Sequence, residues 1–238
     1  MNIKVKRITA IAIVLLMPYL TSCKKNDNNV ALYESDNLYT VNSSCEETTT
    51  TQVIEEEFQE FDGYLKNSIS SEGFESEQYD KVRVLDKEND SYLIENEVYQ
   101  SCYTNLESIG KLPNSYIEVD ISNQTLKLYE DEEEVLESDV VTGKNSTPTD
   151  LGYYSVYYKD CNVTLQGSNG DGTSYASHVS YWMPFNGGEG FHDATWRDSF
   201  GGDIYEFDGS HGCVNMPYEE AEELYNNIES DTKVLIHK

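Results

Sequence analysis

The stretch YIEVDISNQTLKLY, residues 116–129, decides the fold class. Apolar and polar residues alternate on both sides of the short polar segment SNQ, residues 122–124. Alternation with a period of two is typical of half-buried strands, and a polar turn between two such runs predicts an antiparallel hairpin. We therefore expect this part of the chain to be β.

More strands are predicted around this hairpin. They are expected at VLESDVVTG (135–143), GYYSVYY (152–158), NVTLQG (162–167) and KVLIH (233–237). Their close spacing predicts an antiparallel sheet or a β-sandwich. MPYEEAEELYNNI, residues 216–228, predicts a helix instead, because Pro217 and acids at its start precede apolar residues at helical spacing. Residues 113–238 are thus predicted to form one mostly β domain with one or two short helices.

Residues 52–112 are predicted to form a small α+β or SH3-like region of unknown role. Apolar residues recur at helical spacing between residues 52 and 69, with acids opposite, which predicts a helix. KVRVLD (81–86) and SYLIENEVYQSCY (91–103) then predict paired strands around a turn.

The N-terminus has the pattern of a targeting signal. Three basic residues precede an apolar run at 8–20 that is shorter than the roughly 20 residues needed to span a membrane. The run ends in LTSC, which resembles the lipobox of bacterial lipoproteins. The resemblance implies that a signal peptide, residues 1–22, is cleaved and that Cys23 carries lipid; an uncleaved signal anchor is the alternative. Residues 23–51 are polar and predict a tether, which would hold the protein outside the cytoplasm, at a membrane of the cell envelope.

The composition restricts the partners. The chain has 44 Asp and Glu against 16 Lys and Arg, a formal net charge of −28. A field of this sign repels nucleic acid, which we exclude as a partner, and attracts amines. No metal site is predicted, because there are four His and no Cys pair has C-x-x-C spacing. In an oxidising compartment Cys102 and Cys161 can form a disulfide, but the sequence does not fix the pairing.

SHGCVNM, residues 210–216, holds a candidate nucleophile. A thiol is mostly un-ionised at neutral pH, and an acidic chain raises its pKa, so a nucleophilic Cys213 needs a local base. His192 becomes that base if the intervening loop folds back, with Asp193 orienting its ring. The amides of Gly212 and Cys213 are candidates for an oxyanion hole. Packing as a small hydrophobe is the other interpretation of this cysteine.

These residues resemble the active-site signature of the bacterial L,D-transpeptidase catalytic domain, also called YkuD. That signature is a His, a spacer, and then Ser or Thr, His-Gly-Cys, an apolar residue and Asn; here 17 residues separate His192 from Ser210. VVTGKNSTPTDLGYYSV (140–156) is similar to another stretch of the family, and YWMPF (181–185) lies ahead of the catalytic loop. The resemblance covers about residues 113–238 and implies an L,D-transpeptidase-like β-sandwich. The spacing from Pro148 to Gly152 is longer than in many members, which affects a loop.

The resemblance implies a peptidoglycan L,D-transpeptidase that needs no cofactor. Such an acyltransferase cuts the terminal D-Ala from a tetrapeptide stem, holds the acyl group as a cysteine thioester, and passes it to an amine of a neighbouring stem as a 3→3 cross-link. Cys213 would be the nucleophile and His192 the base, oriented by the side chain or carbonyl of Asp193. The residues expected to shape the site and oxyanion pocket are Ser210, His211, Gly212 and Asn215. The residues expected to line the donor cleft are Tyr181, Trp182, Met183, Trp196 and Arg197.

Three alternatives stay open. An ion pair with Asp193 or Asp198 is the other interpretation of Arg197. The same cysteine site can act as an L,D-carboxypeptidase, if water replaces the amine. The protein can also be an inactive wall-binding lipoprotein, although the intact Cys213 and His192 count against this. The donor diamino acid, the acceptor and the oligomeric state do not follow from the sequence.

Overall fold

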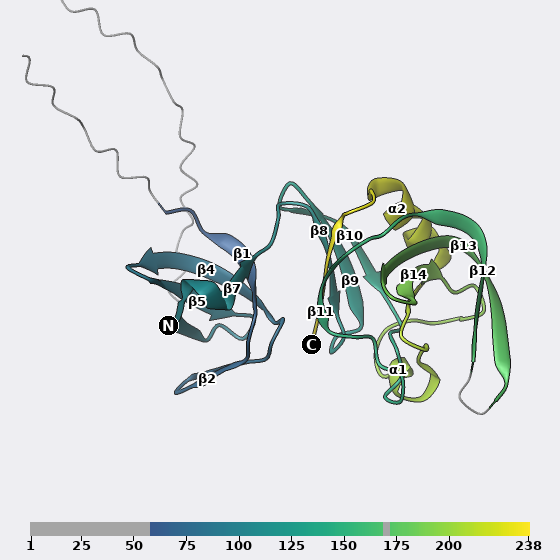
Figure 1. Cartoon of the computed structure of the whole chain (residues 1–238), viewed down its shortest axis with the longest axis horizontal. Helices are drawn as coiled ribbons and strands as arrows, with labels where there is room; N and C mark the ends of the chain where they lie inside the picture. Colours follow the sequence, from purple (N-terminus) through teal and green to yellow (C-terminus); the bar gives the residue numbers. More distant parts are fainter. Residues whose placement is uncertain (1–57, 169–171) are drawn as a thin grey trace, which may run out of the picture. The chain divides into compact units, whose positions relative to one another are not determined.

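The structure, a computed structural model, describes residues 58–168 and 172–238 (Figure 1). The predicted signal peptide, the tether and the first part of the predicted helix lie outside these residues. Within the described residues, no helix has the length and apolar character needed to cross a membrane.

Residues 61–111 form an antiparallel five-stranded sheet and a small hairpin. The sheet order is β6 (Ser101–Asn105), β5 (Ser91–Asn96), β4 (Lys81–Glu88), β1 (Phe61–Leu65) and β7 (Ile109–Lys111). The hairpin pairs β2 (Ile69–Ser71) with β3 (Phe74–Ser76), and a 3-10 turn, Leu106–Ser108, leads into β7. Leu65, Val84 and Ile94 are among the side chains buried at its core. The strands predicted at 81–86 and 91–103 are confirmed as β4, β5 and β6.

The helix predicted between residues 52 and 69 is wrong where the structure describes it. Phe61–Leu65 is strand β1, and the described part of residues 52–112 contains no α-helix. Gly63 explains the error. Glycine weakens a helix interior by about 1 kcal/mol, and here it lets two strands approach closely, since a Cβ at this position would lie 2.9 Å from the Gly110 carbonyl oxygen.

Residues 116–237 form two further sheets. The first has the order β10 (Glu133–Asp139), β9 (Thr125–Glu130), β8 (Tyr116–Asp120), β16 (Lys233–His237) and β11 (Gly152–Ser155). The second has the order β12 (Asp160–Ser168), β13 (Ser174–Asn186), β14 (Glu189–Asp193) and β15 (Val214–Met216). Two helices accompany them, α1 (Ile204–Asp208) and α2 (Tyr218–Asn227). The strands and the helix predicted for this region are confirmed, although the strands predicted to reach residues 143 and 158 end at Asp139 and Ser155, and the fold is mostly β as expected.

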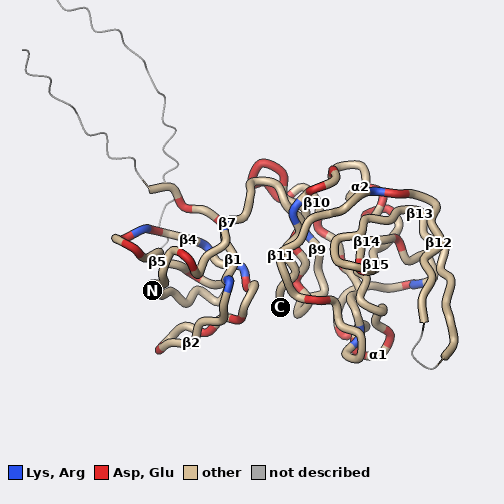
Figure 2. The backbone as a smooth tube through the Cα atoms, in the orientation of Figure 1, with Lys and Arg blue, Asp and Glu red and all other residues tan. Residues whose placement is uncertain are grey.

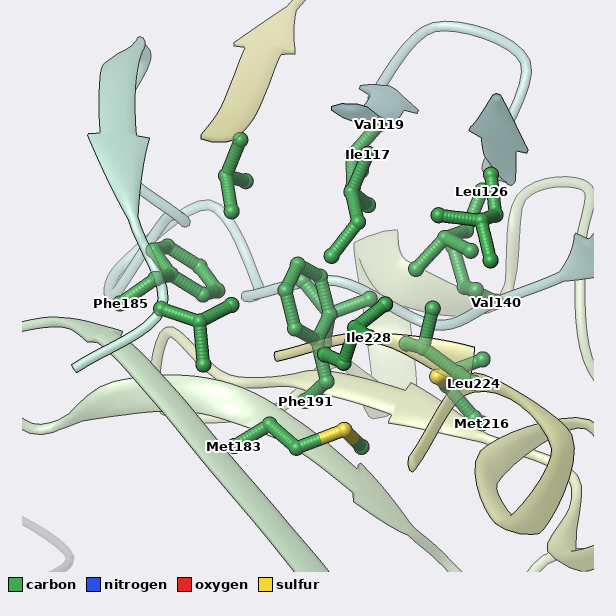
Figure 3. Close-up of a cluster of buried hydrophobic side chains, with 14 of the residues drawn as sticks. Ile117, Val119, Leu126, Val140, Met183, Phe185, Phe191, Met216, Leu224 and Ile228 are labelled. Carbon is green, nitrogen blue, oxygen red and sulfur yellow. The ribbon is translucent and has the colours of Figure 1, made fainter. Parts of the chain in front are cut away.

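A single apolar core joins these two sheets. In Figure 3, Ile117 and Leu126 of the first sheet point toward Phe191 and Met183 of the second, and Leu224 of α2 closes one side. All five side chains are fully buried. The sandwich fixes the relative positions of β14 and β15, which carry the candidate site.

Acidic residues occur along all three main sheets (Figure 2), and nearly all of those described are at least partly exposed. A buried exception is Glu118, which accepts hydrogen bonds from Lys81 Nζ at 2.6 Å and from His237 Nε2 at 3.0 Å. Burial alone would raise the pKa of Glu118, but these partners outweigh it and lower the pKa to about 2. Burial lowers the pKa of His237, but the bond to Glu118 outweighs it and raises the pKa. Glu118 therefore stays ionised and joins β8 to β16 and to β4.

Candidate active site

Strands β14 and β15 bring the two candidate catalytic side chains together. The strands are parallel neighbours, with His192 opposite Asn215, so the histidine lies beside the chain just after Cys213. His192 and Cys213 line one cleft, and Ser210, His211 and Trp196 line it with them. The loop between His192 and Ser210 thus folds back, as is needed to bring His192 close to Cys213.

Hydrogen bonds hold the Ser210–Cys213 loop in place. The Ser210 hydroxyl donates to the Cys213 carbonyl and accepts from the Gly212 N–H at 3.0 Å. Two threonines from the segment that resembles the family stretch support the loop from outside. Thr147 Oγ1 donates to the Ser210 carbonyl at 3.0 Å, and Thr149 Oγ1 donates to the Gly212 carbonyl at 2.8 Å. The backbone before Cys213 is therefore fixed by side chains far away in the sequence.

Gly212 has a backbone conformation that requires glycine. Its φ is +116°, in the region that L side chains rarely adopt, and an added Cβ would lie 2.7 Å from Glu189 Oε1. Its N–H already donates to Ser210, so in this resting arrangement that amide is not directed at a substrate oxyanion. Gly212 shapes the loop that presents Cys213.

The His192 ring is buried and held by the next residue. Its side chain is 4% exposed, and Nδ1 lies 2.9 Å from the Asp193 carbonyl oxygen. A carbonyl only accepts hydrogen bonds, so Nδ1 carries the proton and Nε2 keeps a lone pair. The Asp193 carboxylate accepts instead from the backbone N–H groups of Ser180, at 2.7 Å, and Tyr181, at 2.9 Å. Of the two orienting groups expected on Asp193, the carbonyl is the one that contacts the ring.

Burial keeps both candidate catalytic groups neutral. Burial lowers the pKa of His192 below its usual value. Burial and the nearby Glu189 carboxylate raise the pKa of the Cys213 thiol to about 11. The thiol contacts the Gly188 carbonyl oxygen at 3.6 Å. The resting pair at neutral pH is therefore a thiol and an imidazole.

Comparison with known proteins shows the family of the chain. The family profile of YkuD, the L,D-transpeptidase catalytic domain, matches residues 114–236. The chain belongs to the L,D-transpeptidase family. Comparison with curated proteins gives no match.

Two solved structures from Enterococcus faecium are similar. One is the catalytic domain of an L,D-transpeptidase acylated by ertapenem, with 44% identity and a TM-score of 0.50; the match covers 54% of this chain and all of that one. The other is a cysteine-to-serine mutant of an L,D-transpeptidase, with 30% identity and a TM-score of 0.53, covering 74% of this chain and 76% of that one. The mostly β fold with two helices in the described residues is that of L,D-transpeptidase catalytic domains.

The L,D-transpeptidase cleft is lined differently from the prediction. Trp196 and Arg197 line it as expected. Met183 lies in the apolar core, and the Tyr181 hydroxyl bonds to Glu222 at 2.5 Å, so these two do not line the cleft. Trp182 is 7% exposed and packs near His192, with ring centroids 6.0 Å apart.

The structure adds cleft residues that sequence reasoning missed. Leu165 of β12 and Tyr175 of β13 line the cleft, and the Tyr175 ring stacks on His211 with centroids 5.1 Å apart. Asp208, at the end of α1, lines it too and pairs with Arg197 at 2.8 Å. The expected ion partners of Arg197, Asp193 and Asp198, are thus replaced by Asp208.

Two groups of residues outside the cleft of this L,D-transpeptidase bear on the disulfide and metal predictions. Cys102 and Cys161 are free, so the disulfide left open by the sequence is not formed. Glu97, Glu118 and His237 lie close enough to hold a cation, with ligand atoms within 4.8 Å. The Lys81 ammonium, 2.6 Å from Glu118, supplies positive charge there already and opposes a metal ion.

Proposed function

We propose that this L,D-transpeptidase forms 3→3 cross-links in peptidoglycan through a thioester on Cys213. The observation that carries the proposal is the position of Cys213 and His192 in one cleft, with the His192 lone pair directed by the Asp193 carbonyl. Family membership supplies the reaction class. The carboxypeptidase alternative uses the same two residues and differs in the acceptor alone.

In the first half-reaction, His192 Nε2 takes the proton of the Cys213 thiol. The sulfur attacks the carbonyl carbon of the amide before the terminal D-Ala, which forms the C–S bond. Protonated His192 then gives its proton to the leaving nitrogen, the C–N bond breaks, and D-Ala departs. A thioester remains on Cys213.

In the second half-reaction, an amine of a neighbouring stem attacks the thioester carbon. His192 removes a proton from the attacking nitrogen and returns it to the sulfur as the C–S bond breaks. The acidic surface supports an ammonium-bearing acceptor, because a net charge of −28 raises the local concentration of cations. Ser210, His211, Trp196 and Tyr175 form the cleft walls that would contact the donor stem.

The product mixture distinguishes transfer from hydrolysis. Full-length protein in detergent is incubated with tetrapeptide stems and an amine acceptor, and the products are weighed by mass spectrometry. We expect cross-linked dimers and free D-Ala, and neither with Cys213→Ala. Tripeptide without dimer would establish the carboxypeptidase instead, and unchanged tetrapeptide would favour the wall-binding lipoprotein.

We also propose that Cys23 is lipidated and anchors the protein at a membrane, with residues 23–51 as the tether. The LTSC sequence and the preceding apolar run support this. Growing expressing cells with a fatty-acid probe should label the wild-type protein and leave Cys23→Ala unlabelled. Equal labelling of Cys23→Ala would contradict the anchor, and Cys45→Ala serves as the matched control that keeps its label.

A further inference from the structure

We propose that Arg197 is a positioning residue that acts through Asn215 to keep the Nε2 atom of His192 ready to accept a proton. This inference rests on the proposed role of His192 as the base. It differs from the expectation that Arg197 binds the donor carboxylate.

The Asn215 amide lies between His192 and Arg197 and has one orientation that satisfies both. In that orientation its nitrogen donates to His192 Nε2 at 3.1 Å, and its oxygen accepts from Arg197 Nε at 2.9 Å and from Nη2 at 3.3 Å. Rotating the amide by half a turn would set its nitrogen against guanidinium donors. A guanidinium has no acceptor, so that orientation is unfavourable.

This orientation selects one state of the histidine ring. Nδ1–H donates to the Asp193 carbonyl, and Nε2 accepts from Asn215, which together require a neutral ring with its lone pair at Nε2. Protonating Nε2 would place two donors face to face, unless Asn215 turned and lost its bonds to Arg197. Asn215 therefore occupies the lone pair in the resting site until the Cys213 thiol turns toward it.

Arg197 is itself firmly held. Its side chain is 8% exposed, and it donates from Nη1 to Asp208 Oδ2 at 2.8 Å and from Nη2 to the Asp208 carbonyl at 2.6 Å. With the two bonds to Asn215, four of the five N–H groups of a guanidinium are used. A bidentate grip on a carboxylate needs two free N–H groups. Arg197 is therefore committed to the protein, not to the donor.

The charges around His192 give the sign of the effect. Asp193 adjoins the ring and Arg197 lies beyond Asn215, while Cys213, His211 and Asp208 line the same cleft. Burial lowers the pKa of His192, and the charge of Arg197 adds to that lowering. Removing the guanidinium should raise the pKa and free the Asn215 amide to rotate. Less of the ring is then a base at neutral pH, and the deficit shrinks as the pH rises.

The test compares Arg197→Met with Arg83→Met in the full-length protein. Arg83 is an exposed arginine paired with Asp62, which makes it a matched control outside the cleft. In Arg197→Met we expect kcat to fall about 10- to 100-fold, the effect known for groups that orient the histidine ligands of metal ions, with KM changed less than about 3-fold. Donor stems with an amidated C-terminus should show the same loss. A rise in KM for ordinary donor stems that is absent with the amidated donor would overturn the proposal in favour of carboxylate binding.

Two readouts are independent of peptidoglycan turnover. Nitrogen NMR shifts of His192 should report the Nε2 lone pair in the wild type, and a higher pKa with mixed tautomers in Arg197→Met. In Arg197→Met, alkylation of Cys213 by iodoacetamide at neutral pH should slow as kcat falls. The reagent has no carboxylate, so this slowing cannot come from lost carboxylate binding. If the wild-type protein does not process stems but Arg197→Met still shows these changes, the inference is retained and the proposed function is rejected. Asp208→Asn, altered at an exposed carboxylate, should shift both readouts the same way by a smaller factor. Unchanged NMR and alkylation in both variants would overturn the inference.

Discussion

Replacing Cys213 by serine is expected to remove essentially all transfer activity. A serine hydroxyl has a far higher pKa than a thiol, and the neutral, buried His192 is too weak a base to ionise it in the ground state. The loop itself should survive the change, because its short hydrogen bonds use Ser210, Thr147 and Thr149, whereas the sulfur makes the longer 3.6 Å contact with the Gly188 carbonyl. Product analysis of the serine variant, with unfolding measured in parallel, checks the result. Full activity in Cys213→Ser would remove the nucleophile assignment.

Carbapenem labelling gives a second measurement of the same prediction. The similar Enterococcus faecium domain is recorded as acylated by ertapenem. Opening of a β-lactam ring by a thiol loses no atoms, so the wild type should gain the mass of one intact drug. Peptide mapping should place it on Cys213. The exposed Cys161 is the matched control, and Cys161→Ser should be labelled as fully as the wild type. An adduct on Cys102 or Cys161 would contradict the assignment.

Replacing His192 by alanine is expected to lower kcat by about 10²–10⁴-fold, the usual contribution of a positioned base. KM should change little, because the ring is 4% exposed and offers little surface to a donor. His178→Ala is the matched control. It removes an exposed histidine of β13 and should leave the rate unchanged.

The pH profile separates a base from a merely structural histidine. The pKa of His192 is lowered by burial, so the wild-type rate should rise at a pH below the usual range for histidine and then stay level. In His192→Ala, attack depends on spontaneous ionisation of Cys213. The residual rate should then keep rising with pH toward the thiol pKa of about 11. A uniformly reduced profile of unchanged shape would show that His192 only holds the site together.

Alternation predicted β9, in which buried and partly exposed residues follow one another. β8 and β16 were also predicted as strands, but nearly all of their residues are buried, so they do not have one exposed face. Strand β14 was not predicted, since FHD reads as a short mixed run whose pairing to β15 depends on residues far along the chain. Gly63 counted against a helix at β1, because glycine weakens a helix interior, but the helical spacing of its apolar neighbours outweighed it in the prediction.

The candidate catalytic pair was predictable from chemistry, and much of its surroundings was not. A thiol in an acidic chain needs a base, and that argument selected His192. Placing Tyr181 and Met183 in the cleft was wrong for a reason that alternation explains. In β13 the residues at 181 and 183 face the core, whereas Trp182 faces His192, its partner in register. Thr149 lies in the stretch that resembles the family and Asp208 lies shortly before Cys213, but no pattern in the sequence predicted the contacts that they make.

The position of β16 determines when the catalytic sheet can form during synthesis. Residues 233–237 lie between β8 and β11, and they pair in parallel with a strand that leaves the ribosome more than a hundred residues earlier. Until they emerge, β8 has an open edge and the apolar core lacks Val234 and Ile236. The sheet of residues 61–111 needs none of them, because all its strands are close in sequence. Nascent chains are therefore expected to acquire their first sheet early, and to lack an ordered thiol site until translation has passed residue 237.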